Sequence, residues 1–96
     1  AEFRRMMAAY PGELNEHTLN AFGYDLFQKG RVHDAVDVFT LNVELFPDYA
    51  NGYDSLGEAL LKAGAKSKAR RAYEKALKLD PGLASAKKAL DELSRR

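Results

Sequence analysis

The sequence predicts an all-α chain in which pairs of antiparallel helices stack into a short right-handed solenoid. Three observations predict this fold class: a 34-residue repeat, apolar residues at helical spacing, and glycine or proline where helices should end. Identical residues recur at six positions with an offset of 34: Gly23/Gly57, Leu26/Leu60, Gly30/Gly64, Ala35/Ala69, Leu45/Leu79 and Pro47/Pro81. A fixed period of this length is typical of repeats that bury their apolar faces only by stacking.

The first expected helix covers residues 2–9 and ends at a Tyr-Pro-Gly turn. Residues 1–15 are interpreted as an N-terminal helix and linker, the remnant of a preceding repeat or domain in a longer chain. An apolar stripe on this helix is a candidate end-face contact; it consists of Phe3, Met6, Met7 and Tyr10. We expect it to fold back on Leu19 and Phe22 or to exchange with another copy of the chain.

Two helical hairpins follow, in residues 16–49 and 50–83. Their helices are expected over residues 16–29, 32–45, 50–63 and 66–79. Small residues at Gly23 and Gly57 should let the neighbouring helix approach closely, since a glycine inside a helix otherwise costs about 1 kcal/mol relative to alanine. Gly30 and Gly64 stand where the first helix of each hairpin should end in left-handed backbone.

The last expected helix covers residues 83–95, and residues 84–96 are interpreted as a C-terminal capping helix. Its apolar side is formed by Leu83, Ala86, Leu90 and Leu93. The opposite side is charged, as the terminal helix of a solenoid requires. No strand is expected anywhere in the chain.

The repeated positions resemble the tetratricopeptide repeat (TPR) family, whose pattern is W-x₂-L-G-x₂-Y, then A-x₃-F, then P. The first copy holds Leu19, Phe22, Gly23, Leu26, Ala35, Phe39 and Pro47, and the second holds Tyr53, Leu56, Gly57, Leu60, Ala69, Tyr73 and Pro81. The resemblance covers residues 16–83. It implies a non-catalytic module that binds proteins or peptides.

The stretch from Leu41 to Ala59 also looks like the TPR tail at the C-terminal end of some bacterial serine hydrolases of the β-lactamase and esterase type. Asn42 stands where a TPR usually has a small apolar residue. A buried amide must be hydrogen-bonded, so we expect Asn42 to reach the next repeat near Tyr53, the alternative being an amide tilted to solvent.

No catalytic, cofactor or metal site is expected. The chain has no cysteine, and its two histidines, His17 and His33, lack a second ligand at metal spacing. Ser85 and Lys88 fit the S-x-x-K pattern, but none of the accompanying hydrolase motifs is present. Ser55 lies inside an expected helix rather than on a nucleophile elbow.

Charge is unevenly spread. Residues 1–49 carry four basic and eight acidic side chains, whereas residues 50–96 carry eleven and six. The basic side chains of the second hairpin should lie on its outer helix without interleaved aromatic residues, so no nucleic-acid partner is expected.

No apolar run is long enough to span a membrane. The sequence specifies no cellular location, and the cytoplasm is only a default.

The resemblance implies a groove lined by the first helix of each pair. The candidate peptide-groove residues are His17, Asn20, Tyr24, Gln28, Asn51, Asp54, Ser55, Glu58, Lys62, Ser85 and Lys88. TPR proteins that grip the carboxylate tails of heat-shock chaperones use a Lys/Asn/Asn/Lys/Arg set; the corresponding places here hold Asn20, Tyr24, Ser55, Ser85 and Ala89. The mildly acidic centre instead favours a basic or polar peptide.

Two functional hypotheses follow. In the first, the groove or an end face docks a partner protein, a peptide or an upstream catalytic domain. In the second, the stacked repeats serve as an architectural module for self-association, because the opposite charges of the two halves allow head-to-tail contacts between copies.

Overall fold

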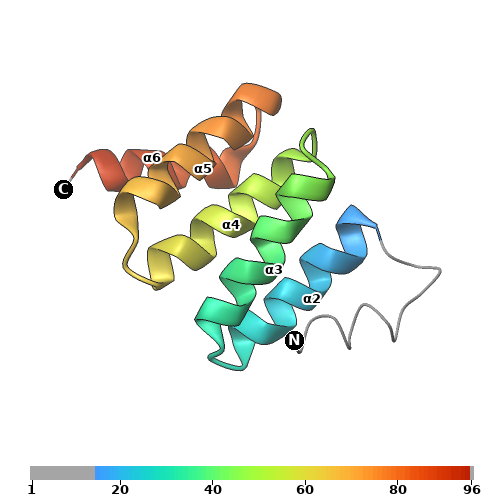
Figure 1. The fold of residues 1–96 in the computed structure, drawn as a ribbon. Helices are drawn as coiled ribbons and strands as arrows, with labels where there is room; N and C mark the ends of the chain where they lie inside the picture. The colour runs from blue at the N-terminus through green and yellow to red at the C-terminus, as the bar shows by residue number, and fades with distance from the viewer. Residues whose placement is uncertain (1–14, 96) are drawn as a thin grey trace.

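The computed structural model describes residues 15–95, which form five α-helices in chain order. They are α2 (Glu16–Gln28), α3 (Val32–Leu45), α4 (Ala50–Lys62), α5 (Lys66–Leu79) and α6 (Ala84–Ser94). The described residues contain no strand, and successive helices lie side by side in an elongated array (Figure 1). The all-α repeat architecture predicted from the sequence is confirmed.

The predicted helix boundaries agree closely with the observed ones. The ranges 32–45 and 66–79 match α3 and α5 at both ends. The helices predicted over 16–29, 50–63 and 83–95 are one residue too long at one or both ends. The helix predicted over 2–9, with its stripe of Phe3, Met6, Met7 and Tyr10, lies outside the described residues.

The start of α2 is fixed by a side-chain cap that the sequence analysis did not identify. Asn15 adopts extended backbone, and its Oδ1 accepts hydrogen bonds from the backbone N–H groups of His17 and Thr18, both at 2.9 Å. These donors have no partner inside the helix, so the asparagine stabilises its first turn.

Both hairpins turn through the same glycine motif. Gly30 has φ 81° and Gly64 has φ 87°. After Gly30 the N–H of Arg31 donates to the Leu26 carbonyl at 3.0 Å, and after Gly64 the N–H of Ala65 donates to the Leu60 carbonyl at 2.9 Å. This pattern satisfies the last carbonyls of the helix and turns the chain into the next one.

Two neighbouring core clusters lie along the array. The first joins α2, α3 and α4 and is centred on the buried residues Leu19, Phe22, Leu26, Ala35, Val38, Phe39 and Ala59. The second joins α5 and α6, with partly buried side chains of α4 packed against it; its buried residues are Ala69, Tyr73, Ala76, Ala86 and Leu93. Helix α4 contributes to both clusters, which makes it the central element of the fold.

The two predicted close approaches are present. A Cβ placed on Gly23 would lie 2.3 Å from Cε1 of Phe39, and one on Gly57 would lie 2.9 Å from the ring of Tyr73. Each aromatic ring therefore packs directly against the backbone of the first helix in its hairpin. The repeated glycine and the repeated aromatic residue are a matched pair.

Asn42 is fully buried, so the alternative of a solvent-exposed amide was wrong. The amide does lie close to Gly52 in the next repeat, but its hydrogen bond is made elsewhere, because Asn42 Nδ2 donates to the backbone carbonyl of Glu16 at 3.0 Å. The amide thus ties α3 to the start of α2 within one hairpin.

Candidate functional site

The first helices of successive hairpins, α2 and α4, and the last helix, α6, are linked by hydrogen bonds along one side of the array. We call the side formed by these three helices the first-helix face. The Tyr24 hydroxyl on α2 donates to Glu58 Oε1 on α4 at 2.6 Å. The Ser85 hydroxyl on α6 donates to Asp54 Oδ2 on α4 at 2.7 Å. Four of the predicted groove residues are thereby brought together.

The centre of this face is rich in hydrogen-bond acceptors. Asp54 Oδ1 and Asn20 Oδ1 are both shielded from solvent and have no hydrogen-bond partner among the described residues. Glu58 adds a second, exposed carboxylate one turn further along α4. Burial raises the pKa of Asp54, the nearby Glu58 charge raises it further, and the hydrogen bond from Ser85 opposes the shift.

The hydroxyl of Tyr24 belongs to the same network. Burial, together with the hydrogen bond to Glu58, raises its pKa to about 12. The ring also packs edge-on against the buried Phe39, with centroids 5.2 Å apart. Tyr24 therefore couples the polar face to the first core cluster and holds Glu58 in a defined position.

Most of the other predicted groove residues are exposed. Ser55 is the exception, because its side chain is only 3% exposed and hydrogen-bonds the Tyr24 hydroxyl. The prediction that Ser55 lines an open groove was wrong, since α4 turns this position toward α2. The exposed predicted residues are His17, Gln28, Asn51, Glu58, Lys62, Ser85 and Lys88, and the half-buried ones are Asn20, Tyr24 and Asp54.

A second feature lies at the start of α2, where the loop between α3 and α4 passes. His17 packs edge-on against Tyr49, with ring centroids 5.3 Å apart, and the Tyr49 hydroxyl lies 3.4 Å from His17 Nδ1. A pocket of about 420 Å³ opens beside this pair. Sequence analysis missed it because Tyr49 lies between two predicted helices, outside any periodic pattern.

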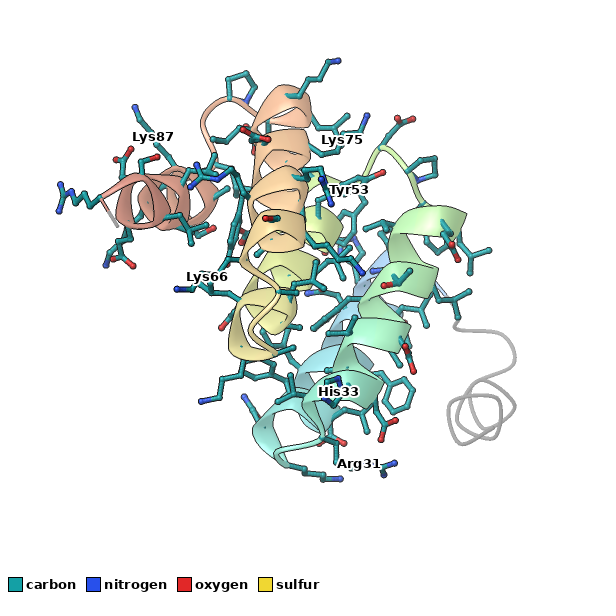
Figure 2. The ribbon with its side chains drawn as sticks, turned by 60° about the vertical axis from the view of Figure 1, so that its left-hand side comes forward. Arg31, His33, Tyr53, Lys66, Lys75 and Lys87 are labelled. Atoms are coloured by element: carbon teal, nitrogen blue, oxygen red, sulfur yellow. The ribbon has the colours of Figure 1, made fainter. Side chains whose placement is uncertain are left out.

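The basic side chains of α5 lie mainly on its exposed side, as predicted. Lys66 and Lys75 extend from this helix in Figure 2, and Lys75 Nζ lies 5.9 Å from the centre of the Tyr53 ring. Arg70 differs from them because it reaches across to α6, where its guanidinium donates to the Leu93 carbonyl at 3.3 Å. Part of the basic run therefore serves to dock the last helix.

No catalytic or metal-binding arrangement is evident over residues 15–95. Within that range no group of three or more His, Cys, Asp or Glu side chains could hold a metal ion. Ser85 of the S-x-x-K pattern donates to Asp54, and Lys88 is exposed. His33 also faces solvent, at the end of the molecule where Figure 2 labels it.

Comparison with known proteins identifies the repeat. Residues 50–83 match the family model described as tetratricopeptide repeat, with the boundaries predicted for the second hairpin. The chain is a short tetratricopeptide-repeat solenoid. Residues 16–49 form the same helix–turn–helix, with Gly23, Gly30 and Phe39 in equivalent places, and we interpret them as another copy of the repeat.

Curated relatives contain a similar segment. The Hsp70-Hsp90 organizing protein of Triticum aestivum is 47% identical over 73 residues, which cover 69% of this chain and 13% of that protein. Protein arginine N-methyltransferase 9 is 32% identical over 75 residues in both Homo sapiens and Mus musculus, covering 78% of this chain and 9% of each relative. The TPR chain thus spans only about a tenth of the length of these relatives.

These findings support protein binding as the general role of the TPR chain. The resemblance to the tail of bacterial serine hydrolases stays a prediction. In the part of the chain that the structure describes, no helix is both long and apolar enough to cross a membrane.

Proposed function

We propose that this TPR chain is a non-catalytic module that docks a peptide segment of a partner protein along the first-helix face. The observation that carries the proposal is the acceptor cluster at the centre of that face. Asn20 and Asp54 each leave a shielded oxygen without a partner, and Glu58 is held beside them by Tyr24. Because the two shielded oxygens are covered, a docked peptide would meet this cluster through the exposed Glu58 carboxylate and the negative charge of Asp54 behind it.

The charge of this face favours a ligand with basic or amide donors. Asp54 and Glu58 supply negative charge, and complementary charge directs partner choice more than it raises raw affinity. Capture of an acidic, carboxylate-terminated chaperone tail is not favoured. At the corresponding places this chain has Asn20, Tyr24, Ser55, Ser85 and Ala89, and none of these is a cation.

A peptide array tests the proposal directly. The purified chain is incubated with an array of random peptides of matched length, and the residue composition of bound spots is compared with that of the whole array. We expect enrichment of lysine, arginine and amide side chains, and depletion of acidic ones. Enrichment of acidic, carboxylate-terminated peptides would contradict the proposal.

Matched variants then locate the binding surface. Asp54→Asn and Glu58→Gln remove one charge each from the first-helix face and should weaken the strongest array binders. Glu74→Gln removes one charge from the exposed side of α5 and serves as the control. Equal weakening by all three variants would mean that net charge, rather than this face, determines binding.

A second function, self-association, is favoured by the uneven charge. Residues 15–49 carry two basic and six acidic side chains, whereas the exposed side of α5 is basic. Head-to-tail contact of such surfaces propagates from copy to copy. Light scattering at rising salt distinguishes this function from peptide docking, because a charge-driven assembly should shrink toward the monomer.

A further inference from the structure

The pocket beside His17 and Tyr49 has a composition that differs from the first-helix face. It is an open surface pocket of about 420 Å³, lined by Glu16, His17, Leu45, Phe46, Pro47, Asp48 and Tyr49. Leu45 is 47% exposed, and it is the one large hydrophobic side chain among the described residues that stands out in this way. The pocket therefore combines an apolar floor, aromatic rings and two carboxylates.

The aromatic side of the pocket is held in place by contacts of its rings. Tyr49 is held edge-on by His17, and Phe46 packs its partly buried ring against the first core cluster. Tyrosine and phenylalanine rings carry partial negative charge on their faces, which attracts a cation lying over them. An alkyl chain would also cover the exposed part of Leu45 and lower its contact with water.

The carboxylate side of the pocket has no lysine or arginine in its lining, and Glu16 Oε1 lies 3.5 Å from Nε2 of His17. Asp48 is exposed and Glu16 is half-buried. The two basic residues of the described first hairpin, Lys29 and Arg31, form ion pairs with Asp25 and Asp34 at the other end of α2 and the start of α3. The described first hairpin thus brings no lysine or arginine to these two carboxylates, and the exposed Asp48 is the one that a cation from a partner can reach most directly.

We propose that this pocket is a second docking site, which receives a lysine or arginine side chain of a partner protein. The alkyl stem lies on Leu45 and Phe46, and the cationic head lies between the Tyr49 ring and the carboxylates of Glu16 and Asp48. Both basic side chains combine an apolar stem with a charged end, as this lining requires. The site goes beyond the proposed peptide docking, because six of its seven lining residues lie outside the predicted groove; only His17 belongs to both.

The test uses two small probes with the same stem and different charge. N-acetyl-lysine methylamide carries the ammonium group, and N-acetyl-norleucine methylamide lacks it. Amide chemical shifts of the whole chain are followed by NMR during titration with each probe. We expect the lysine probe to shift the amides of Leu45, Phe46, Asp48 and Tyr49 with a dissociation constant in the millimolar range, and the norleucine probe to bind more weakly.

Three variants make the assignment specific. Asp48→Asn should weaken the lysine probe by about threefold, which is the scale of a partly exposed ion pair, and should leave the norleucine probe unchanged. Leu45→Ser should weaken both probes. Glu44→Gln is the matched control, because this exposed neighbour of Leu45 does not line the pocket and should change neither probe.

Several results would overturn the site. Equal affinity for both probes would remove the role of charge. Shifts confined to Asp54 and Glu58 would assign the probe to the first-helix face instead. Pocket shifts that change on dilution of the chain without any probe would mean that another copy of the chain occupies the pocket.

Discussion

The close contact between Gly23 and Phe39 gives the sharpest quantitative prediction for this fold. In Gly23→Ala, the new Cβ would lie 2.3 Å from Cε1 of Phe39, whereas ordinary contact begins near 3.4 Å. The ring would have to retreat by about 1 Å, and Phe39 is fully buried. The substitution therefore overpacks the first core cluster.

Two effects oppose each other in this variant. Alanine is favoured over glycine inside a helix by about 1 kcal/mol. Overpacking a buried site typically costs about 1 to 3 kcal/mol, and the short distance points to the upper end. We expect a net loss of about 2 kcal/mol, which would lower Tm by roughly 8 to 16 °C in a domain of this size.

Urea denaturation followed by far-ultraviolet circular dichroism measures this loss. Gly57→Ala should lose less stability, because the new Cβ would lie 2.9 Å from the nearest atoms of the Tyr73 ring. Gly82→Ala is the control, since its Cβ would lie 3.6 Å from the nearest atom, Asp80 Oδ1. In the double variant Gly23→Ala/Phe39→Leu the smaller side chain should relieve the clash, giving a coupling energy above about 1 kcal/mol. A stabilised Gly23→Ala, or additive effects in the double variant, would refute the reasoning.

Three further predictions concern buried polar groups. Asn42→Asp should destabilise the chain by at least about 2 kcal/mol, because it places a carboxylate against the Glu16 carbonyl. Asn42→Leu should destabilise it less. Chemical denaturation that ranks the two variants in the opposite order would contradict this prediction. Burial raises the pKa of Tyr24 to about 12, so the stability that the protonated hydroxyl contributes is complete below pH 10 and is lost as pH rises toward 12. In Tyr24→Phe, Tm should therefore fall less steeply over that pH range. An unchanged slope of Tm against pH would contradict this prediction. Burial also raises the pKa of Asp54, so Asp54→Asn, which can still accept from Ser85, should leave Tm unchanged or higher at pH 7; a clear drop in Tm would indicate a structural rather than a binding role.

The fold could be predicted in detail because its constraints are local. The 34-residue offset aligned Gly30 with Gly64, and both have the left-handed backbone that a hairpin turn needs. Gly23 and Gly57 were predicted as close approaches for the same reason, since only a missing side chain allows contact at that position.

The candidate site could be predicted only in part, because it depends on which side chains meet between helices. The helical period placed Asp54 and Glu58 on one face, but it did not predict that Tyr24 and Ser85 would hold them by hydrogen bonds. It also placed Ser55 on the open side, although this residue is buried. In a helix with 3.6 residues per turn, an exposed position and a buried position can be direct neighbours in the sequence.

The pocket beside Tyr49 depends on a loop conformation, for which no periodic signal exists. The hydrogen-bond partner of Asn42 was predicted wrongly for a similar reason. Burial of the amide requires a hydrogen bond, whereas the packing of the helices decides which of the two neighbouring helices supplies the acceptor.

The contribution of α4 to both core clusters has a consequence for the order in which the helices unfold. Arg70 and the Ser85–Asp54 hydrogen bond fasten α6 to the rest of the described chain, while the first cluster contains no residue from α5 or α6. Unfolding can therefore start by peeling α6 from one end, and amide exchange should be fastest there and slowest in α3 and α4. A peptide that docks across α4 and α6 would oppose this local unfolding, so its binding should be detected as slower amide exchange in α6.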